Sequence, residues 1–151
     1  MHNEIRMAAS PAQCFQVAAD VERWPEILSH YRRVRFRRRD GFGRGLVEMA
    51  ALRMFGPAGY PVWWVSEMWT DESVPVIRYR HVEGVTKGMD VEWRFRSDGN
   101  GTHVEIVHDW SRGPKWPIIG KFAGDRVIGP IFIYHVAGMT LEGVKKAVEA
   151  L

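Results

Sequence analysis

Alternating apolar and polar positions run through most of the chain and predict an antiparallel β-sheet. The clearest case is the stretch 91–96, where Val91, Trp93 and Phe95 alternate with charged residues, so that one face is buried and the other solvated. The same period of two, or a short apolar run between turn residues, predicts strands at 4–8, 31–39, 46–55, 62–70, 77–82, 91–96 and 103–110. Successive strands of this kind form one sheet with a wet and a dry face.

Apolar residues spaced three or four apart replace this alternation in three places and predict helices. Ser10 followed by Pro11 is a helix start, because serine caps the free amides and proline fits the first turn. A second short helix follows, with Asp20 as its cap and Trp24 on its buried side. The last helix carries an apolar stripe through Val127, Ile131, Tyr134, Gly138, Leu141, Val144 and Val148.

This order of elements predicts an α+β fold: a curved seven-stranded antiparallel sheet around a long C-terminal helix, with two short helices after the first strand. One helix cannot fill so large a curved sheet, so we expect a central cavity between them. A chain of 151 residues, 46% hydrophobic and 26% charged, has the size and composition of one globular domain spanning 1–151. Trp116 and Pro117, with the glycines that follow them, are candidates for a gate at the cavity mouth.

Composition and charge narrow the function classes. A single cysteine, Cys14, excludes an internal disulfide framework and a cysteine-built zinc site. The first residues lack the apolar run of a secretory leader, and charged residues interrupt the apolar stretch 117–141, so we expect a soluble protein. The single cysteine favours a reducing compartment, so we expect the protein to be cytoplasmic. The net charge of +3 does not by itself indicate nucleic-acid binding, and no recognition helix or stacking platform is evident.

The inward face of the expected sheet carries the candidate chemistry. His81 and His108 either move protons, since an ordinary histidine pKa lies near neutrality, or are core histidines that bond to neighbours. His81 and Tyr31 are the weak catalytic candidates; Tyr31 and Ser66 either donate to a ligand oxygen or are satisfied by backbone carbonyls. The aromatic residues either line the cavity or fill the core. The residues expected to bind a ligand are Tyr31, Trp64, Ser66, Met68, Tyr79, His81, Trp93, Phe95, Ile106, His108, Trp110 and Tyr134.

No metal site and no cofactor are expected, because the six histidines lack close paired spacing and inward-facing carboxylates. An arginine run between Arg32 and Arg39 crowds one strand. Its outward members either meet an acidic acyl carrier protein or anionic membrane headgroups, or form a solvated edge that discourages strand-to-strand aggregation. The sequence leaves the oligomeric state open.

Several strings resemble the polyketide cyclase/dehydrase group of the helix-grip superfamily, which also includes START domains and Bet v 1. They are DVERWP at 20–25 with Tyr31 after it, WVSE at 64–67, MDVEW at 89–93, the Gly101-Thr102 hairpin exit and the aromatic-rich last helix. The resemblance covers nearly the whole chain and implies the helix-grip fold. In similar aromatase/cyclases the cavity holds a carrier-tethered polyketide, which polar residues orient for aldol cyclisation and dehydration.

By position, Tyr31 and Ser66 match polar cavity residues of that group, and Trp64 and Trp93 match wall aromatics. Two cavity arginines of the group are replaced here, one by Met68 and the other by His81. These replacements remove donors that would bind a polar ketide and stabilise an enolate.

We therefore expect a cavity more apolar than that of the similar aromatase/cyclases. It should bind a hydrophobic small molecule that resembles a lipid, a quinone or a polyketide and that can be aromatic. The alternative is a polyketide cyclase, aromatase or dehydratase acting on a carrier-tethered chain. A third hypothesis is that the chain has a partner-binding role similar to that of the quinone-binding proteins that support respiratory chains.

Overall fold

The computed structural model describes the backbone of residues 1–55, 58–110 and 123–151, and their side chains except 53–55, 58, 60 and 123–132. The elements in chain order are β1 (His2–Met7), α1 (Pro11–Ala19), η1 (Val21–Arg23), α2 (Trp24–Ile27), β2 (Tyr31–Gly41), β3 (Arg44–Phe55), β4 (Ala58–Asp71), β5 (Val76–Gly84), β6 (Asp90–Asp98), β7 (Gly101–Asp109) and α3 (Ala123–Glu149). The proposed gate residues Trp116 and Pro117 lie outside the described residues.

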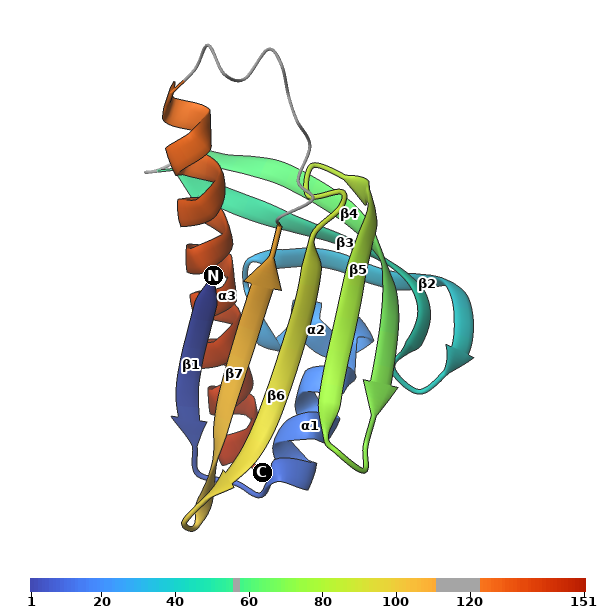
Figure 1. Cartoon of the computed structure of the whole chain (residues 1–151), viewed down its shortest axis with the longest axis vertical. Helices are drawn as coiled ribbons and strands as arrows, with labels where there is room; N and C mark the ends of the chain where they lie inside the picture. The colour runs from blue at the N-terminus through green and yellow to red at the C-terminus, as the bar shows by residue number, and fades with distance from the viewer. Residues whose placement is uncertain (56–57, 111–122) are drawn as a thin grey trace.

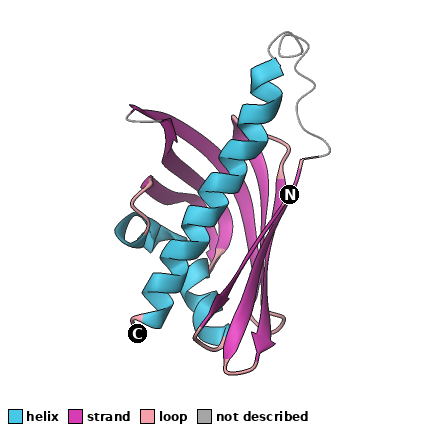
Figure 2. Ribbon diagram, turned by 90° about the vertical axis from the view of Figure 1, so that its left-hand side faces the viewer, coloured by secondary structure: helices cyan, strands magenta, loops and turns pink. Residues whose placement is uncertain are grey.

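The strands form one seven-stranded sheet in the order β1-β7-β6-β5-β4-β3-β2, and each neighbouring pair is antiparallel. The sheet curves around α3, which crosses its inner face, while α1 and α2 close one end (Figures 1 and 2). These observations confirm the predicted α+β fold. None of the described helices is long and apolar enough to cross a bilayer.

The period-two pattern predicts correctly which side chains face the core. In β6, Val91, Trp93 and Phe95 are buried, and the residues between them are at least partly exposed. β2 departs from strict alternation, because its register with β3 shifts between Tyr31 and Arg33. This irregularity lets Tyr31 and Val34, three residues apart, both point into the core.

Local sequence explains the start of α1 but not that of the next helix. The Ser10 hydroxyl accepts from the Gln13 amide, and the Gln13 side chain accepts from the Ser10 amide, which completes a capping box. Asp20 makes no side-chain cap bond, so the prediction that it caps the second helix is wrong. It instead ends α1, with its amide donating to the Gln16 carbonyl, and it lacks the extended conformation typical of an N-cap.

The buried face of α3 differs by one residue from the predicted stripe in its central part. Ile133 and Ala137 are buried, whereas Tyr134 is 53% exposed. Leu141, Val144 and Val148 are buried as predicted. Toward the N-terminus from Leu141, the next buried residue of a helix can lie three or four positions away. In α3 it lies four positions away each time, at Ala137 and then at Ile133. The sequence alone did not distinguish the two.

Candidate functional site

A cavity of about 70 Å³ lies between the inner face of the sheet and α3. Helix α2, strands β2 to β7, the β5–β6 connection and α3 all contribute to its wall. Among the residues expected from sequence, those that line it are Tyr31, Trp64, Tyr79, His81, Trp93, Ile106 and His108. The sheet thus brings together side chains that are up to 77 positions apart in the chain, from Tyr31 on β2 to His108 on β7.

Five of the expected ligand-binding residues are not in this lining. Ser66 and Met68 of β4 are buried, but neither lines the cavity. Phe95 packs edge to face against Phe15 of α1, with ring centroids 5.9 Å apart. Met68 and Phe95 belong to the packed hydrophobic core, and Ser66 is a buried polar residue outside the cavity wall.

The other two lie at the margins. Trp110 follows the end of β7, and its indole N–H donates to the Lys87 carbonyl at 3.2 Å. Tyr134 is exposed because the buried stripe of α3 runs through Ile133 and Ala137. The geometry therefore does not support a ligand contact from Tyr134.

Residues that sequence reasoning missed complete the wall. Trp24 of α2 forms part of it, with its ring edge to face against Tyr31 at 5.0 Å. Thr86 lies in the β5–β6 connection, and Ala137 and Thr140 come from α3. The spacing of three between Ala137 and Thr140 places both on one helix face, a signal that becomes readable once the register of α3 is known.

Three buried polar atoms of the cavity wall have no hydrogen-bond partner among the described residues. They are the indole Nε1 of Trp24, the hydroxyl of Tyr79 and Nδ1 of His108. An unpartnered buried polar group costs about 1 to 3 kcal/mol, so native proteins rarely keep several without reason. No Asp, Glu, Lys or Arg occurs in the described lining, so the wall is apolar with a few hydrogen-bonding groups.

The family model described as polyketide cyclase / dehydrase and lipid transport matches residues 7–128. The chain belongs to this family. The resemblance read from the local strings is thereby confirmed. The match covers every strand after β1 and reaches the first turns of α3.

Relatives of this polyketide cyclase/dehydrase family member agree with the assignment. A Streptomyces cyaneus protein named "Putative polyketide cyclase" is 30% identical over 118 residues, covering 77% of this chain and 75% of that protein. The crystal structure of the Zhui aromatase/cyclase from Streptomyces sp. R1128 superposes with a TM-score of 0.82 at 23% identity, covering 99% of this chain and 92% of that one. A crystal structure from Thermus thermophilus gives a TM-score of 0.77 at 20% identity, with 99% and 97% coverage. These two structural likenesses establish the fold.

In this family member the two cavity histidines are held in their neutral form. Burial lowers the pKa of His81 to about 3, with a further contribution from His108. Burial also lowers the pKa of His108 to about 4, helped by the N-terminal ammonium. His81 is fixed by a hydrogen bond to Thr86 and by stacking on Trp64, with centroids 5.8 Å apart. At neutral pH both imidazoles are therefore uncharged.

The tyrosines of the cavity are likewise neutral. Burial raises the pKa of Tyr79 well above its ordinary value, with a smaller contribution from Tyr31. The pKa of Tyr31 is also raised by burial, and its hydroxyl bonds to Thr140. Thr140 donates to the Val136 carbonyl at 2.7 Å and therefore accepts from His30 Nε2 at 3.1 Å. The site can thus offer neutral donors and acceptors within an apolar wall.

Proposed function

We propose that this chain binds a hydrophobic small molecule carrying a carbonyl group in the cavity between the sheet and α3. The observation that carries the proposal is that Trp24, Tyr79 and His108 line one cavity and that each keeps a buried polar atom, Nε1, OH and Nδ1 respectively, without a partner among the described residues. An indole N–H only donates, and a neutral phenol donates one proton. A ligand oxygen that accepts from either group would satisfy it, while the aromatic wall would bury the rest of the molecule.

The size of the cavity adds a requirement. About 70 Å³ is small beside the roughly 300 to 1,000 Å³ typical of ligand pockets. A tricyclic or longer ligand must therefore displace wall side chains or separate α3 from the sheet. A cavity that must rearrange to admit its ligand would enclose the ligand once it is bound. We therefore expect the bound ligand to exchange slowly with solvent. Native mass spectrometry of the freshly purified protein, followed by organic extraction, would identify the class of any retained molecule.

The carbonyl preference can be tested with fluorenone and fluorene, which differ in the ketone oxygen. We expect the wild-type chain to bind fluorenone more tightly, and Tyr79→Phe to lower fluorenone affinity about 5- to 10-fold without changing fluorene affinity, because one neutral hydrogen bond is worth about 1 kcal/mol. Fluorescence titration measures both. Tyr134→Phe removes an exposed hydroxyl and is the matched control. A ketone preference that persists in Tyr79→Phe would contradict the assignment of this donor.

The second candidate is a polyketide cyclase, aromatase or dehydratase acting on a carrier-tethered chain. It is favoured by the family match and by two histidines on one cavity. The low pKa of His81 weakens this reading, since a general base works best with a pKa near the operating pH. If His81 is catalytic, His81→Ala should abolish turnover of a tethered polyketide yet retain ligand binding, with the exposed His135→Ala as control. Equal loss of turnover and binding would exclude the catalytic role.

A partner surface for a carrier protein remains a prediction. Arg33, Arg35 and Arg37 all lie within 3.6 Å of the buried Glu48 carboxylate, and Arg37 also pairs with Glu83 at 3.1 Å. The three arginines lower the pKa of Glu48, chiefly through the hydrogen bond from Arg35. Arg38 pairs with Asp40 and Glu67, and Arg39 pairs with Glu22, so a small excess of positive charge on the edge strand β2 supports docking of an acidic partner or an anionic headgroup.

A further inference from the structure

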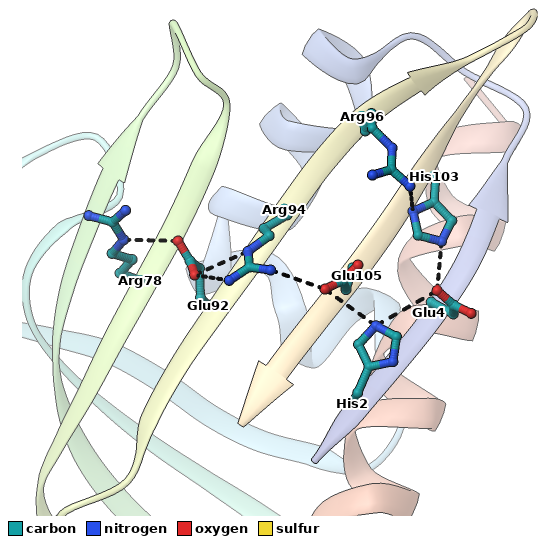
Figure 3. A network of polar contacts seen from close by, with 8 residues as sticks. All are labelled: His2, Glu4, Arg78, Glu92, Arg94, Arg96, His103 and Glu105. Atoms are coloured by element: carbon teal, nitrogen blue, oxygen red, sulfur yellow. Dashed lines mark hydrogen bonds and ion pairs between the residues drawn. The ribbon is translucent and has the colours of Figure 1, made fainter. Parts of the chain in front are cut away.

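The sequence contains His-x-Glu three times, at 2–4, 81–83 and 103–105, and the sheet brings the first and last copies side by side. His2 and Glu4 lie on β1, and His103 and Glu105 lie on β7. Residues two apart in a strand share a face. Because β1 pairs with β7 with Glu4 opposite Glu105, all four side chains meet on the outer face of the sheet, away from α3 (Figure 3).

The distances between these side chains suit a small metal ion. His2 Nε2 lies 3.3 Å from Glu105 Oε1 and 3.7 Å from Glu4 Oε2. One ligand atom each from His2, Glu4 and Glu105 lies within 4.8 Å of the others. Bonds of about 2.1 Å in tetrahedral geometry place ligand atoms roughly 3.4 Å apart. His2 and Glu4 side chains are about half exposed, 48% and 54%, so they can make the remaining adjustment.

His103 has a different role, which its neighbours determine. Arg96 Nη2 lies 3.3 Å from His103 Nδ1, and a guanidinium can only donate. Nδ1 is therefore the acceptor, and Nε2–H donates to Glu4 Oε2 at 2.8 Å. The hydrogen bond from His103 thus orients the Glu4 carboxylate. Carboxylates that bind metal ions are commonly oriented in this way, by a hydrogen bond from a residue that does not itself contact the metal.

The charges also favour a cation. Like charges directly opposite each other in a ladder are destabilising, and Glu4 faces Glu105. Arg94 pairs with Glu105 at 3.3 Å and with Glu92 at 2.8 Å. Within the described part of the chain, the partners of Glu4 are His2 and His103, and no lysine or arginine is paired with it. A divalent ion between the carboxylates would offset their repulsion.

We propose that His2, Glu4 and Glu105 bind one first-row divalent transition-metal ion, with water in the remaining positions and His103 holding Glu4. An imidazole with two carboxylates favours ions such as Zn²⁺ over Ca²⁺ and Mg²⁺. The expectation of no metal site rests on histidines without close paired spacing and on missing inward-facing carboxylates, whereas this cluster faces outward and joins two strands. The ion would tie edge strand β1 to β7, whose His108 carbonyl already accepts from the Met1 ammonium at 2.9 Å.

Isothermal titration of the full, untagged chain with ZnCl₂ in a non-chelating buffer tests the proposal. We expect one Zn²⁺ per chain, and at least tenfold weaker binding for both Glu105→Gln and His2→Ala. His135→Ala removes an exposed histidine outside the cluster and should bind as the wild type does. At tenfold excess over the Kd, Zn²⁺ should raise the wild-type Tm by about 3 to 5 °C.

Two results would overturn the site. Zn²⁺ binding of equal strength in wild type, Glu105→Gln and His2→Ala would show that any binding occurs elsewhere. Ca²⁺ binding as tight as Zn²⁺ binding would show that the imidazole is not a ligand. Circular dichroism of each variant establishes that lost binding is not lost folding.

Discussion

Replacing Ala137 with leucine is expected to lower fluorenone affinity more than tenfold while the chain stays folded. Ala137 lies on the buried face of α3, is 5% exposed and lines the cavity. Leucine adds three carbons to a space of about 70 Å³, so it occupies the volume that a ligand needs. Each buried methylene contributes about 0.8 kcal/mol when it fits, and overpacking costs about 1 to 3 kcal/mol, so the net change in unfolding free energy should stay small.

The matched control for this substitution is Ala150→Leu, at the exposed end of the chain after α3. It adds the same carbons without touching the cavity and should leave affinity unchanged. Fluorescence titration and thermal melts by circular dichroism provide the two readouts. A folded Ala137→Leu chain that binds fluorenone as the wild type does would place the ligand outside this cavity.

The sequence predicts the sheet well because its side-chain period is two and each slip would expose the core. Strands β5 to β7 show this: Tyr79, Trp93 and Ile106 face inward as expected and line the cavity. Helix α3 is harder, because an apolar stripe can continue by three or four residues. The placement of Tyr134 was wrong for that reason, although Leu141 was correctly placed.

Other features depend on tertiary packing that periodicity does not encode. Phe95 alternates like a cavity residue, yet Phe15 of α1 covers it. Trp24 was placed on a buried side, but its unpartnered indole in the cavity wall becomes evident only in three dimensions. The proposed metal cluster can be predicted only in part from the sequence. Its two His-x-Glu strings are visible there, but only the pairing of β1 with β7 shows that they lie side by side.

A large loss of stability is expected at Gly84, where β5 meets β4. Gly84 pairs with Trp64, next to the register shift between the two strands, and its φ of +98° is one that side-chain-bearing residues rarely adopt. A Cβ there would lie 2.4 Å from the Trp63 carbonyl oxygen and 2.7 Å from the Trp64 Cα, both backbone atoms. Gly84→Ala should therefore cost about 3 kcal/mol or more and lower the Tm by roughly 6 to 12 °C.

Gly99→Ala separates the two causes of the lost stability in Gly84→Ala, which are the positive φ and the close approach of backbone atoms. Gly99 also has a positive φ, +60°, but the nearest atom to a methyl group added there is a flexible Arg6 nitrogen at 3.9 Å, so about 1 kcal/mol is expected. The difference between the two melts measures the close backbone approach at Gly84. Because Trp64 stacks on His81 at the cavity wall, Gly84→Ala should also alter the near-ultraviolet circular dichroism and weaken fluorenone binding. Equal melting temperatures for the two variants would mean that the close backbone approach at Gly84 adds nothing to the cost of its positive φ.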